Sequence, residues 1–207
     1  MTNKADREAY FRDVERTIRD YYLADPSNPY RQSGKTGGAK HWETTRRCIA
    51  QAVNANGDYL DLGCANGLLL ASLVRWCAKR GFAITPHGVD FIPELIDLAR
   101  KRLPAYAANF HVANTFFWQP PRRYRFVQLL LDAVPPADQH AYIARVLNEM
   151  VATPGRLIVS VYGQGTSATP AVAVETLDGL GFKAAGAAAC VSASVAWIDK
   201  DPERSTW

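Results

Sequence analysis

Cysteine pairs at the spacing of disulfide or metal motifs are missing from this sequence. Its four cysteines, Cys48, Cys64, Cys77 and Cys190, are scattered without a C-x-x-C arrangement, and no H-E-x-x-H motif occurs. This argues against a disulfide-stapled scaffold and the common zinc motifs, so we expect no metal site. A reducing cytoplasm is the simplest compartment for such a chain, and we expect a cytoplasmic protein.

Long hydrophobic runs are also missing. No apolar stretch approaches the roughly 18 residues that cross a bilayer. The segment MTNKADREAYFRD at the start carries charges of both signs and lacks the apolar core of a secretion signal. We therefore expect neither secretion nor a membrane partner.

A strong excess of one charge is absent too, because 24 Lys and Arg face 20 Asp and Glu. Six of the basic residues gather in two short groups: Arg100, Lys101, Arg102, Arg122, Arg123 and Arg125. Such groups can bind nucleic acid, but no interleaved aromatics and no known nucleic-acid module accompany them. A solvated helix end and a basic loop explain them better, so we expect no nucleic-acid partner.

The first part of the chain predicts a helix, a loop and a second helix. Over 6–23, apolar residues recur at three- and four-residue steps between charged ones, as in an amphipathic helix. Residues 25–40 are rich in Pro, Gly and Ser, which predicts a loop. A second helix is expected over 42–53.

From residue 58 onward, apolar strands and helices alternate. Strands are predicted at 58–62, 83–89, 107–112, 125–131 and 156–161, and helices at 67–80, 92–102 and 137–151. A helix at 170–180 and strands at 182–190 and 192–199 follow, and the short link between these strands makes one of them antiparallel. The pattern predicts an α/β, doubly wound, Rossmann-like fold with a mostly parallel seven-stranded sheet and helices on both faces.

A glycine-rich turn follows the first strand of this sheet. The segment 58–73, DYLDLGCANGLLLASL, places Gly63 and Gly67 between the strand and an apolar helix. Glycine allows the sharp turn and the close approach of a ligand to the backbone. A dinucleotide fingerprint would need glycines where this turn has Ala65 and Leu68, so that pattern matches poorly.

The spacing Asp61-x-Gly63-x-Ala65-x-Gly67 resembles the first motif of the class I S-adenosylmethionine-dependent methyltransferases, with alanine in place of the middle glycine. A chance glycine turn is the alternative. Asp90 ends the second strand 23 positions after Gly67, close to where a carboxylate would bind a ribose diol. Alone, Asp90 could equally cap the helix that follows it.

The resemblance covers residues 40–199 and implies S-adenosylmethionine as methyl donor, with S-adenosylhomocysteine as product. It implies cofactor contacts from Arg31, Asp61, Gly63, Cys64, Ala65, Gly67, Asp90, Phe91, Asn114, Thr115 and Leu131. Asn114 would bind the adenine amino group, unless it is an ordinary loop residue. Phe91 would lie against the adenine ring or pack in the core. Arg31 would pair with the methionine carboxylate.

The residues after the fourth strand narrow the kind of methyl transfer. Residues 131–136, LDAVPP, lack the aromatic of enzymes that methylate base amino groups and the cysteine of cytosine C5 enzymes. A small-molecule acceptor remains, methylated on oxygen or nitrogen. A base is needed only if the acceptor must lose a proton, and Asp132 and His140 are the candidate catalytic residues. His140 could instead lie on an exposed helix face.

We expect a single domain over 1–207, in which residues 1–40 form a helical lid and 41–207 form the cofactor-binding core. Aromatic residues would then line the acceptor site and suit a ring-bearing substrate. These are Tyr21, Tyr22, Tyr30, Trp42 and Tyr162. Packing at the surface is the alternative for each of them.

Two other functions stay open at this point. One is a methyltransferase that acts on RNA or protein, suggested by the basic residues of 100–125. The other is a catalytically silent nucleotide-binding domain or a different Rossmann-like enzyme. Whether the chain is a monomer or a homodimer is also open.

Overall fold

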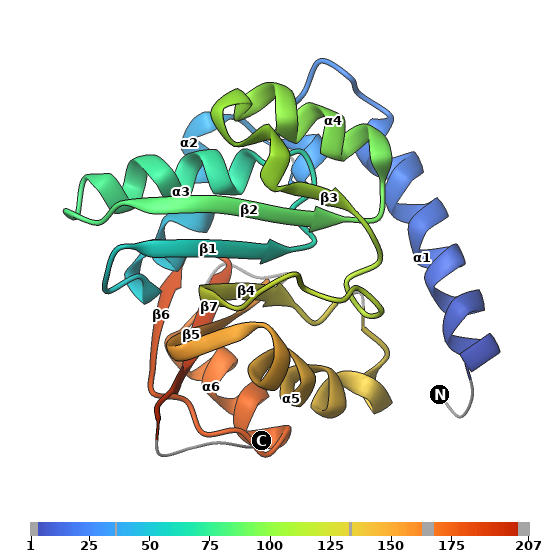
Figure 1. The fold of residues 1–207 in the computed structure, drawn as a ribbon. Coiled ribbons are helices and arrows are strands. Elements are labelled where there is room, and N and C mark those ends of the chain that lie inside the picture. Colours follow the sequence, from blue (N-terminus) through green and yellow to red (C-terminus); the bar gives the residue numbers. More distant parts are fainter. Residues whose placement is uncertain (1–3, 36, 133, 163–167, 203–207) are drawn as a thin grey trace.

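The computed structural model describes residues 4–35, 37–132, 134–162 and 168–202. A seven-stranded sheet forms its centre, in the order β3-β2-β1-β4-β5-β7-β6 (Figure 1). The strands are β1 Gly57–Leu62, β2 Ile84–Asp90, β3 Phe110–Val112, β4 Tyr124–Leu130, β5 Val151–Tyr162, β6 Gly186–Cys190 and β7 Ala193–Lys200. The first five strands pair in parallel, whereas β7 runs antiparallel to both β5 and β6. The predicted sheet and its antiparallel strand are confirmed.

Helices cover both faces of this sheet, with α2, α3 and α4 on one side and α5 and α6 on the other (Figure 1). The α-helices are α1 Lys4–Leu23, α2 Ala39–Arg46, α3 Leu68–Ala78, α4 Pro93–Arg102, α5 Gln139–Glu149 and α6 Pro170–Gly179. Short 3₁₀ helices are η1 Arg31–Ser33, η2 Arg47–Ala52, η3 Pro104–Asn109 and η4 Pro136–Asp138.

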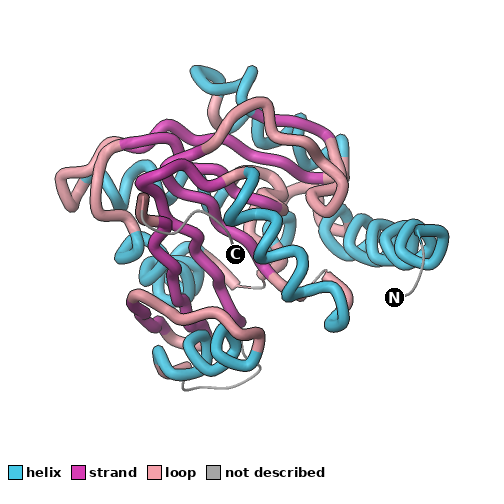
Figure 2. The backbone as a smooth tube through the Cα atoms, turned by 60° about the horizontal axis from the view of Figure 1, so that its bottom comes forward, coloured by secondary structure: helices cyan, strands magenta, loops and turns pink. Residues whose placement is uncertain are grey.

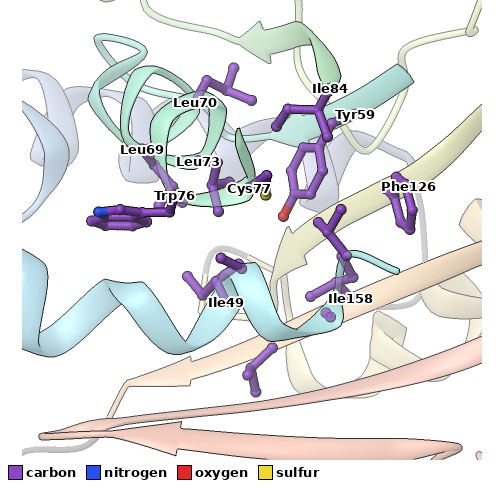
Figure 3. Close-up of a cluster of buried hydrophobic side chains, with 14 of the residues drawn as sticks. Ile49, Tyr59, Leu69, Leu70, Leu73, Trp76, Cys77, Ile84, Phe126 and Ile158 are labelled. Atoms are coloured by element: carbon purple, nitrogen blue, oxygen red, sulfur yellow. The ribbon is translucent and has the colours of Figure 1, made fainter. Parts of the chain in front are cut away.

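Strand β1 shows why the sheet needs helices on both faces. Successive side chains of a strand point to opposite faces, so a strand buried on both sides is apolar throughout. Leu60 and Leu62 pack into the cluster that contains α5 and α6. Tyr59 packs on the other face, among residues of η2 and α3 (Figure 3). Asp61 shares the face of Tyr59, and its polar side chain interrupts this pattern.

Helix α1 lies outside these layers, beside the carboxyl ends of the central strands (Figures 1 and 2). The Arg7 guanidinium donates to both carboxylate oxygens of Asp138, at 3.0 and 2.7 Å. Phe11 is buried, and its ring lies 5.2 Å from that of Phe116. The amphipathic helix predicted over 6–23 is therefore present, and its apolar side faces the edge of the sheet where ligands bind in open α/β folds.

Three predicted elements differ from the structure. The helix expected over 42–53 divides at Arg46, whose φ of −128° leaves the α region, and it continues as the tighter η2. The strand expected over 107–112 is shorter, because a 3₁₀ segment from Pro104 occupies its first part. The strand expected over 182–190 begins only at Gly186, where a Cβ would lie 2.4 Å from the Trp197 ring.

No helix among the described residues combines the length and apolarity that a membrane span requires.

Candidate functional site

The turn between β1 and α3 lies at the centre of the candidate site. Gly63 and Gly67 have φ of +88° and +71°, which favours glycine at both positions. A Cβ on Gly63 would meet no atom within 4 Å, whereas one on Gly67 would lie 2.9 Å from the Ala99 Cβ. Gly63 therefore borders open space, and Gly67 allows α4 to pack closely against the turn.

Asp61 comes directly before this turn and is 4% exposed. No hydrogen bond or ion pair reaches its carboxylate from any residue that the structure describes. Burial and the nearby charge of Asp90 raise the pKa of Asp61 to about 7. Burying a carboxylate without a partner is costly, so this group is suited to a ligand that brings a hydrogen-bond donor or a positive charge.

Asp90 ends β2 and is also buried. One of its oxygens accepts from the Ala65 N–H at 2.9 Å, and the other accepts from the Ile92 N–H at 3.0 Å. Burial raises the pKa of Asp90 to about 6, although these N–H groups lower it. Asp90 thus holds the turn and the start of α4 together. A carboxylate has further lone pairs, so Asp90 could accept hydrogen bonds from a ribose in addition to these two, and the ribose contact stays a prediction.

A first cavity, here called cavity A, has a volume of about 430 Å³ and lies between α1 and the strand ends. Helix α1 supplies one wall, through Tyr10, Phe11, Asp13, Val14, Thr17, Ile18 and Tyr22. The other wall includes six residues that the sequence assigned to the site: Gly63, Asp90, Phe91, Asn114, Thr115 and Asp132. The structure therefore brings these residues together around one space.

A second cavity, here called cavity B, has a volume of about 490 Å³ and a more polar lining. The residues that the sequence assigned to the site and that line it are Tyr21, Tyr22, Trp42, Asp61, Gly63, Cys64, Ala65, Asp132 and Tyr162. Tyr22, Gly63, Leu130 and Asp132 line both cavities, so the two spaces meet beside the turn. Their sizes suit a small ligand with two chemically different ends.

Asp132 lies where the two cavities meet, just after β4. Desolvation by the surrounding walls raises the pKa of its carboxyl, and the charge of Arg46 opposes this shift. Part of the side chain is still exposed. A carboxylate in this position can accept a proton from a ligand in either cavity.

Sequence reasoning missed four polar residues that line cavity B: Ser33, Lys35, Arg46 and Gln128. Arg46 falls within the helix predicted over 42–53, and nothing in the sequence distinguishes it from the other charged residues there. Gln128 did carry a signal, since it is the polar residue inside the apolar strand segment RFVQLLL. A polar side chain in a strand covered on both faces commonly has a specific partner, and here the Tyr59 hydroxyl donates to the Gln128 side-chain oxygen.

Three predicted site residues line neither cavity and make other contacts in the structure. The Arg31 side chain donates to the Tyr21 carbonyl oxygen at 3.0 Å and lies over the Tyr21 ring. Tyr30 packs against Trp42. The His140 Nδ1 is 2.8 Å from the Leu180 carbonyl oxygen, so this histidine is engaged between α5 and α6.

Two more predicted cofactor contacts, Leu131 and Gly67, also line neither cavity. Leu131 belongs to the apolar cluster under α5 and α6 and lines neither cavity. Gly67 is also absent from both linings, and its close approach to Ala99 gives it a packing role. Both residues shape the turn and the strand end without facing the cavities.

The N-terminal segment is tied to the glycine turn through Asn66, which is fully buried. The Asn66 amide donates to the Pro29 carbonyl oxygen at 2.9 Å and to the Gln32 side-chain oxygen at 3.2 Å. Its own side-chain oxygen accepts from the Ser33 hydroxyl and the Leu68 N–H. The loop expected over 25–40 is therefore anchored over most of its described part.

The basic residues of 100–125 are largely used within the chain. Contacts with other parts of the molecule are Arg100 to the Phe110 carbonyl, Arg102 to the Asn66 carbonyl, Arg122 to the Asp58 carboxylate and Arg125 to the Pro154 carbonyl. These contacts support the interpretation of a helix end and a basic loop. Among the residues that the structure describes, no cluster of His, Cys, Asp or Glu could hold a metal ion.

No protein-family model matches the sequence, and no curated protein sequence matches it. Solved structures do. A 1,6-didemethyltoxoflavin-N1-methyltransferase from Burkholderia thailandensis, with its substrate and S-adenosylhomocysteine bound, has 16% identity and a TM-score of 0.64, over 97% of this chain and 92% of that one. A ribosomal protein L11 methylase from Lactobacillus delbrueckii subsp. bulgaricus has 13% identity and a TM-score of 0.54, over 80% and 81%.

A third similar structure is a methyltransferase from Geobacter sulfurreducens in complex with S-adenosylhomocysteine, with 14% identity and a TM-score of 0.53 over 83% of this chain and 73% of that one. At these identities the likeness concerns the fold. The chain has the Rossmann-like fold of S-adenosylmethionine-dependent methyltransferases.

Proposed function

We propose that this chain is a class I S-adenosylmethionine-dependent methyltransferase that acts on a small-molecule acceptor. The observation that carries the proposal is the buried Asp61 carboxylate, which faces cavity B without a hydrogen-bond partner among the described residues. It lies directly before a turn whose Gly63 leaves open space. The shared fold supports the same function.

The two cavities fit the two ends of the methyl donor. In cavity A, Asp90 accepts hydrogen bonds from the ribose hydroxyls, and Phe91 and Asn114 face the adenine. In cavity B, Asp61 binds the ammonium group of the methionine end. Gly63 lines both cavities, and its missing side chain lets the ligand pass from one to the other.

S-adenosylmethionine supplies a methyl group on a sulfonium sulfur; a lone pair of the acceptor forms the new bond while the carbon–sulfur electron pair stays on sulfur. The protein contributes alignment and the exclusion of water. Helix α1 closes one side of cavity A and so acts as the lid. Asp132 accepts the proton of an acceptor that must lose one, because its raised pKa makes it a stronger base.

A small acceptor is favoured by the volume of cavity B, about 490 Å³, which falls in the range of small-molecule pockets. A ring-bearing acceptor fits the aromatic side chains of Tyr21, Trp42 and Tyr162. An RNA or protein acceptor is the second candidate, and the L11 methylase with the same fold keeps it in view. Salt-sensitive binding to RNA would favour the second candidate.

Calorimetry is expected to detect binding of S-adenosylhomocysteine and S-adenosylmethionine, and no binding of NAD. Asp61→Asn is expected to weaken the binding of S-adenosylhomocysteine by roughly tenfold or more, because it removes a charged hydrogen bond. Asp97→Asn is the matched control, since Asp97 is exposed and pairs with Arg100 on the outside of α4. Tight NAD binding, or unchanged affinity in Asp61→Asn, would contradict the proposal.

Cofactor affinity is expected to fall as the pH is lowered through 7. The free Asp61 carboxyl has a pKa of about 7, so it is mostly protonated below that pH. An ammonium ligand favours the carboxylate, lowers this pKa and releases a proton on binding. The affinity can fall by about tenfold for each pH unit, until the pH reaches the pKa that Asp61 has in the complex.

Titrations in buffers of different ionisation enthalpy measure this proton release directly. Asp61→Asn is expected to remove the part of it that is centred near pH 7, leaving a smaller part from Asp90, whose pKa is about 6. An affinity that stays flat between pH 5 and 8 would rule out ionisation of Asp61 on binding.

A further inference from the structure

Arg46 is a buried cation that forms no ion pair with any residue the structure describes. It is 5% exposed and lines cavity B. Its guanidinium lies 3.6 Å from the centre of the Tyr162 ring and 5.3 Å from that of Trp42. Its hydrogen bond in the structure goes to the Thr45 carbonyl oxygen at 3.3 Å. A guanidinium has five N–H donors, so most of them stay available to a ligand.

A second cation, Lys35, lines the same cavity. Its Nζ is 3.5 Å from the Ser192 hydroxyl, and no acidic partner is present among the described residues. Burial and the charge of Arg46 lower the pKa of Lys35. Asp132 lines the same cavity and its charge interacts with that of Arg46, but among the described residues it forms no ion pair with either cation. The two neighbouring cations therefore still favour an anionic ligand between or beside them.

Both cations lie on the side of cavity B away from Asp61. Arg46 covers Tyr162 at the end of β5, and Lys35 reaches Ser192, which directly precedes β7. Asp61 belongs to β1, and β4 lies between β1 and β5 in the sheet. The ammonium end of the methionine group and the cationic end of the cavity are therefore separated by the width of a strand.

Cavity B is lined by two cations, Arg46 and Lys35, and by two acids, Asp61 and Asp132, and the cations exceed what the single carboxylate of the methyl donor needs. On the proposed function, its methionine end brings one ammonium group, for Asp61, and one carboxylate. One carboxylate leaves at least one of the two cations for the other ligand. Arg46 is the better anchor for that ligand, because the rings of Trp42 and Tyr162 hold its planar group in place, and both rings also line the cavity in which a planar ligand would lie.

We propose that the acceptor is a small ring-bearing acid, whose carboxylate or similar anionic group binds Arg46, with Lys35 as the neighbouring positive charge. This rests on the proposed function. The acid group is an anchor at the β5–β7 side, and the methylated atom lies nearer Asp132, where the two cavities meet. The acceptor thus spans cavity B from its cationic end to the methyl donor.

The first test asks whether Arg46 belongs to the acceptor or to the methyl donor. Arg46→Gln is expected to bind S-adenosylhomocysteine within about twofold of the original protein, a change well under 1 kcal/mol. 5′-Methylthioadenosine, which lacks the amino-acid end, serves as the second ligand. A clear loss for S-adenosylhomocysteine with none for methylthioadenosine would assign Arg46 to the donor's carboxylate and overturn the proposal.

The second test uses matched acids and amides on the protein loaded with S-adenosylhomocysteine. Benzoate and indole-3-acetate are compared with benzamide and indole-3-acetamide by ligand-observed NMR. Each acid is expected to bind about tenfold more tightly than its amide, the value of a charged hydrogen bond. Arg46→Gln is expected to remove this preference.

Arg47→Gln is the matched control, because Arg47 is the next residue, is exposed and pairs with Glu43 outside the cavity. It removes the same charge and should keep the preference for acids. Acids that bind no better than amides, or that keep their advantage in Arg46→Gln, would overturn the proposal. Failure of the unaltered protein to bind S-adenosylhomocysteine would instead refute the proposed function, so the two failures are distinguishable.

Discussion

Gly63→Val is expected to weaken the binding of S-adenosylhomocysteine about a hundredfold or more while leaving the domain folded. The Gly63 backbone borders both cavities, and a Cβ built there meets no protein atom within 4 Å. The valine side chain would therefore be accommodated, but it would fill the space through which the methyl donor passes. Calorimetry measures the loss, and Gly63→Ala should give a smaller loss in the same direction.

The backbone cost of this substitution needs its own control. Gly63 has φ of +88°, where a side chain costs about 1–2 kcal/mol and more for a β-branched one. Gly81 has φ of +85°, also has no atom within 4 Å of a Cβ, and lies in the turn after α3 away from both cavities. Gly81→Val should lower the unfolding temperature similarly and leave ligand binding unchanged.

Equal loss of binding in the two valine variants would mean that the effect comes from general destabilisation. Full binding in Gly63→Val would mean that no ligand passes over the turn, and the placement of the methyl donor across Gly63 would be wrong. The pair of variants thus separates a steric effect in the site from a backbone effect on the fold.

The part of the site that sequence reasoning found is local in the chain. Asp61, Gly63 and Asp90 follow directly from where apolar strands end, and parallel strands bring their carboxyl ends to one edge. Strand ends can be predicted from the hydrophobic pattern and from glycine, so the convergence of these residues around the two adjoining cavities was predictable. Gly67 and Leu131 show the limit, because a motif position next to the site can still point into the core.

The residues that the sequence did not find depend on how the N-terminal segment lies over the sheet. Arg31 and Arg46 both precede the first strand of the sheet, and of the two only Arg46 lines a cavity. The difference arises from tertiary contacts. Asn66 fixes the segment around Pro29 and Gln32, and α2 changes to a 3₁₀ helix at Arg46. Periodicity within 42–53 predicted one continuous helix, which gives a different direction to every side chain after that point.

His140 illustrates a second limit. Its position eight residues after Asp132 made it a candidate base, but α5 begins at Gln139 and directs this side chain toward Leu180 and Phe182. The number of residues between two positions does not determine which side chains in the first turn of a helix point toward the edge of the sheet. The phase of α5 is set by the apolar residues that it buries, such as Ile143 and Leu147.

Deleting residues 1–23 is expected to leave a folded core that binds S-adenosylhomocysteine about tenfold more weakly or worse. The sheet and its two large apolar clusters form almost entirely from later residues. Helix α1 adds the Arg7–Asp138 pair and a small cluster in which Ile18 packs near Ile92, so its removal costs limited stability. It does, however, supply seven lining residues of cavity A, and without them the adenosine end would be open to water.

A pair of point variants tests the same wall without truncation. Val14→Glu places a charge where α1 faces cavity A, and Ala9→Glu places the same charge at an exposed position of α1 that lines neither cavity. Only Val14→Glu should weaken the binding of S-adenosylhomocysteine, because the new carboxylate at this position would lose its water against the ligand. Circular dichroism checks that both variants keep α1. If the truncated protein and Val14→Glu bind as tightly as the full chain, α1 packs beside the site without closing it, and the lid hypothesis is wrong.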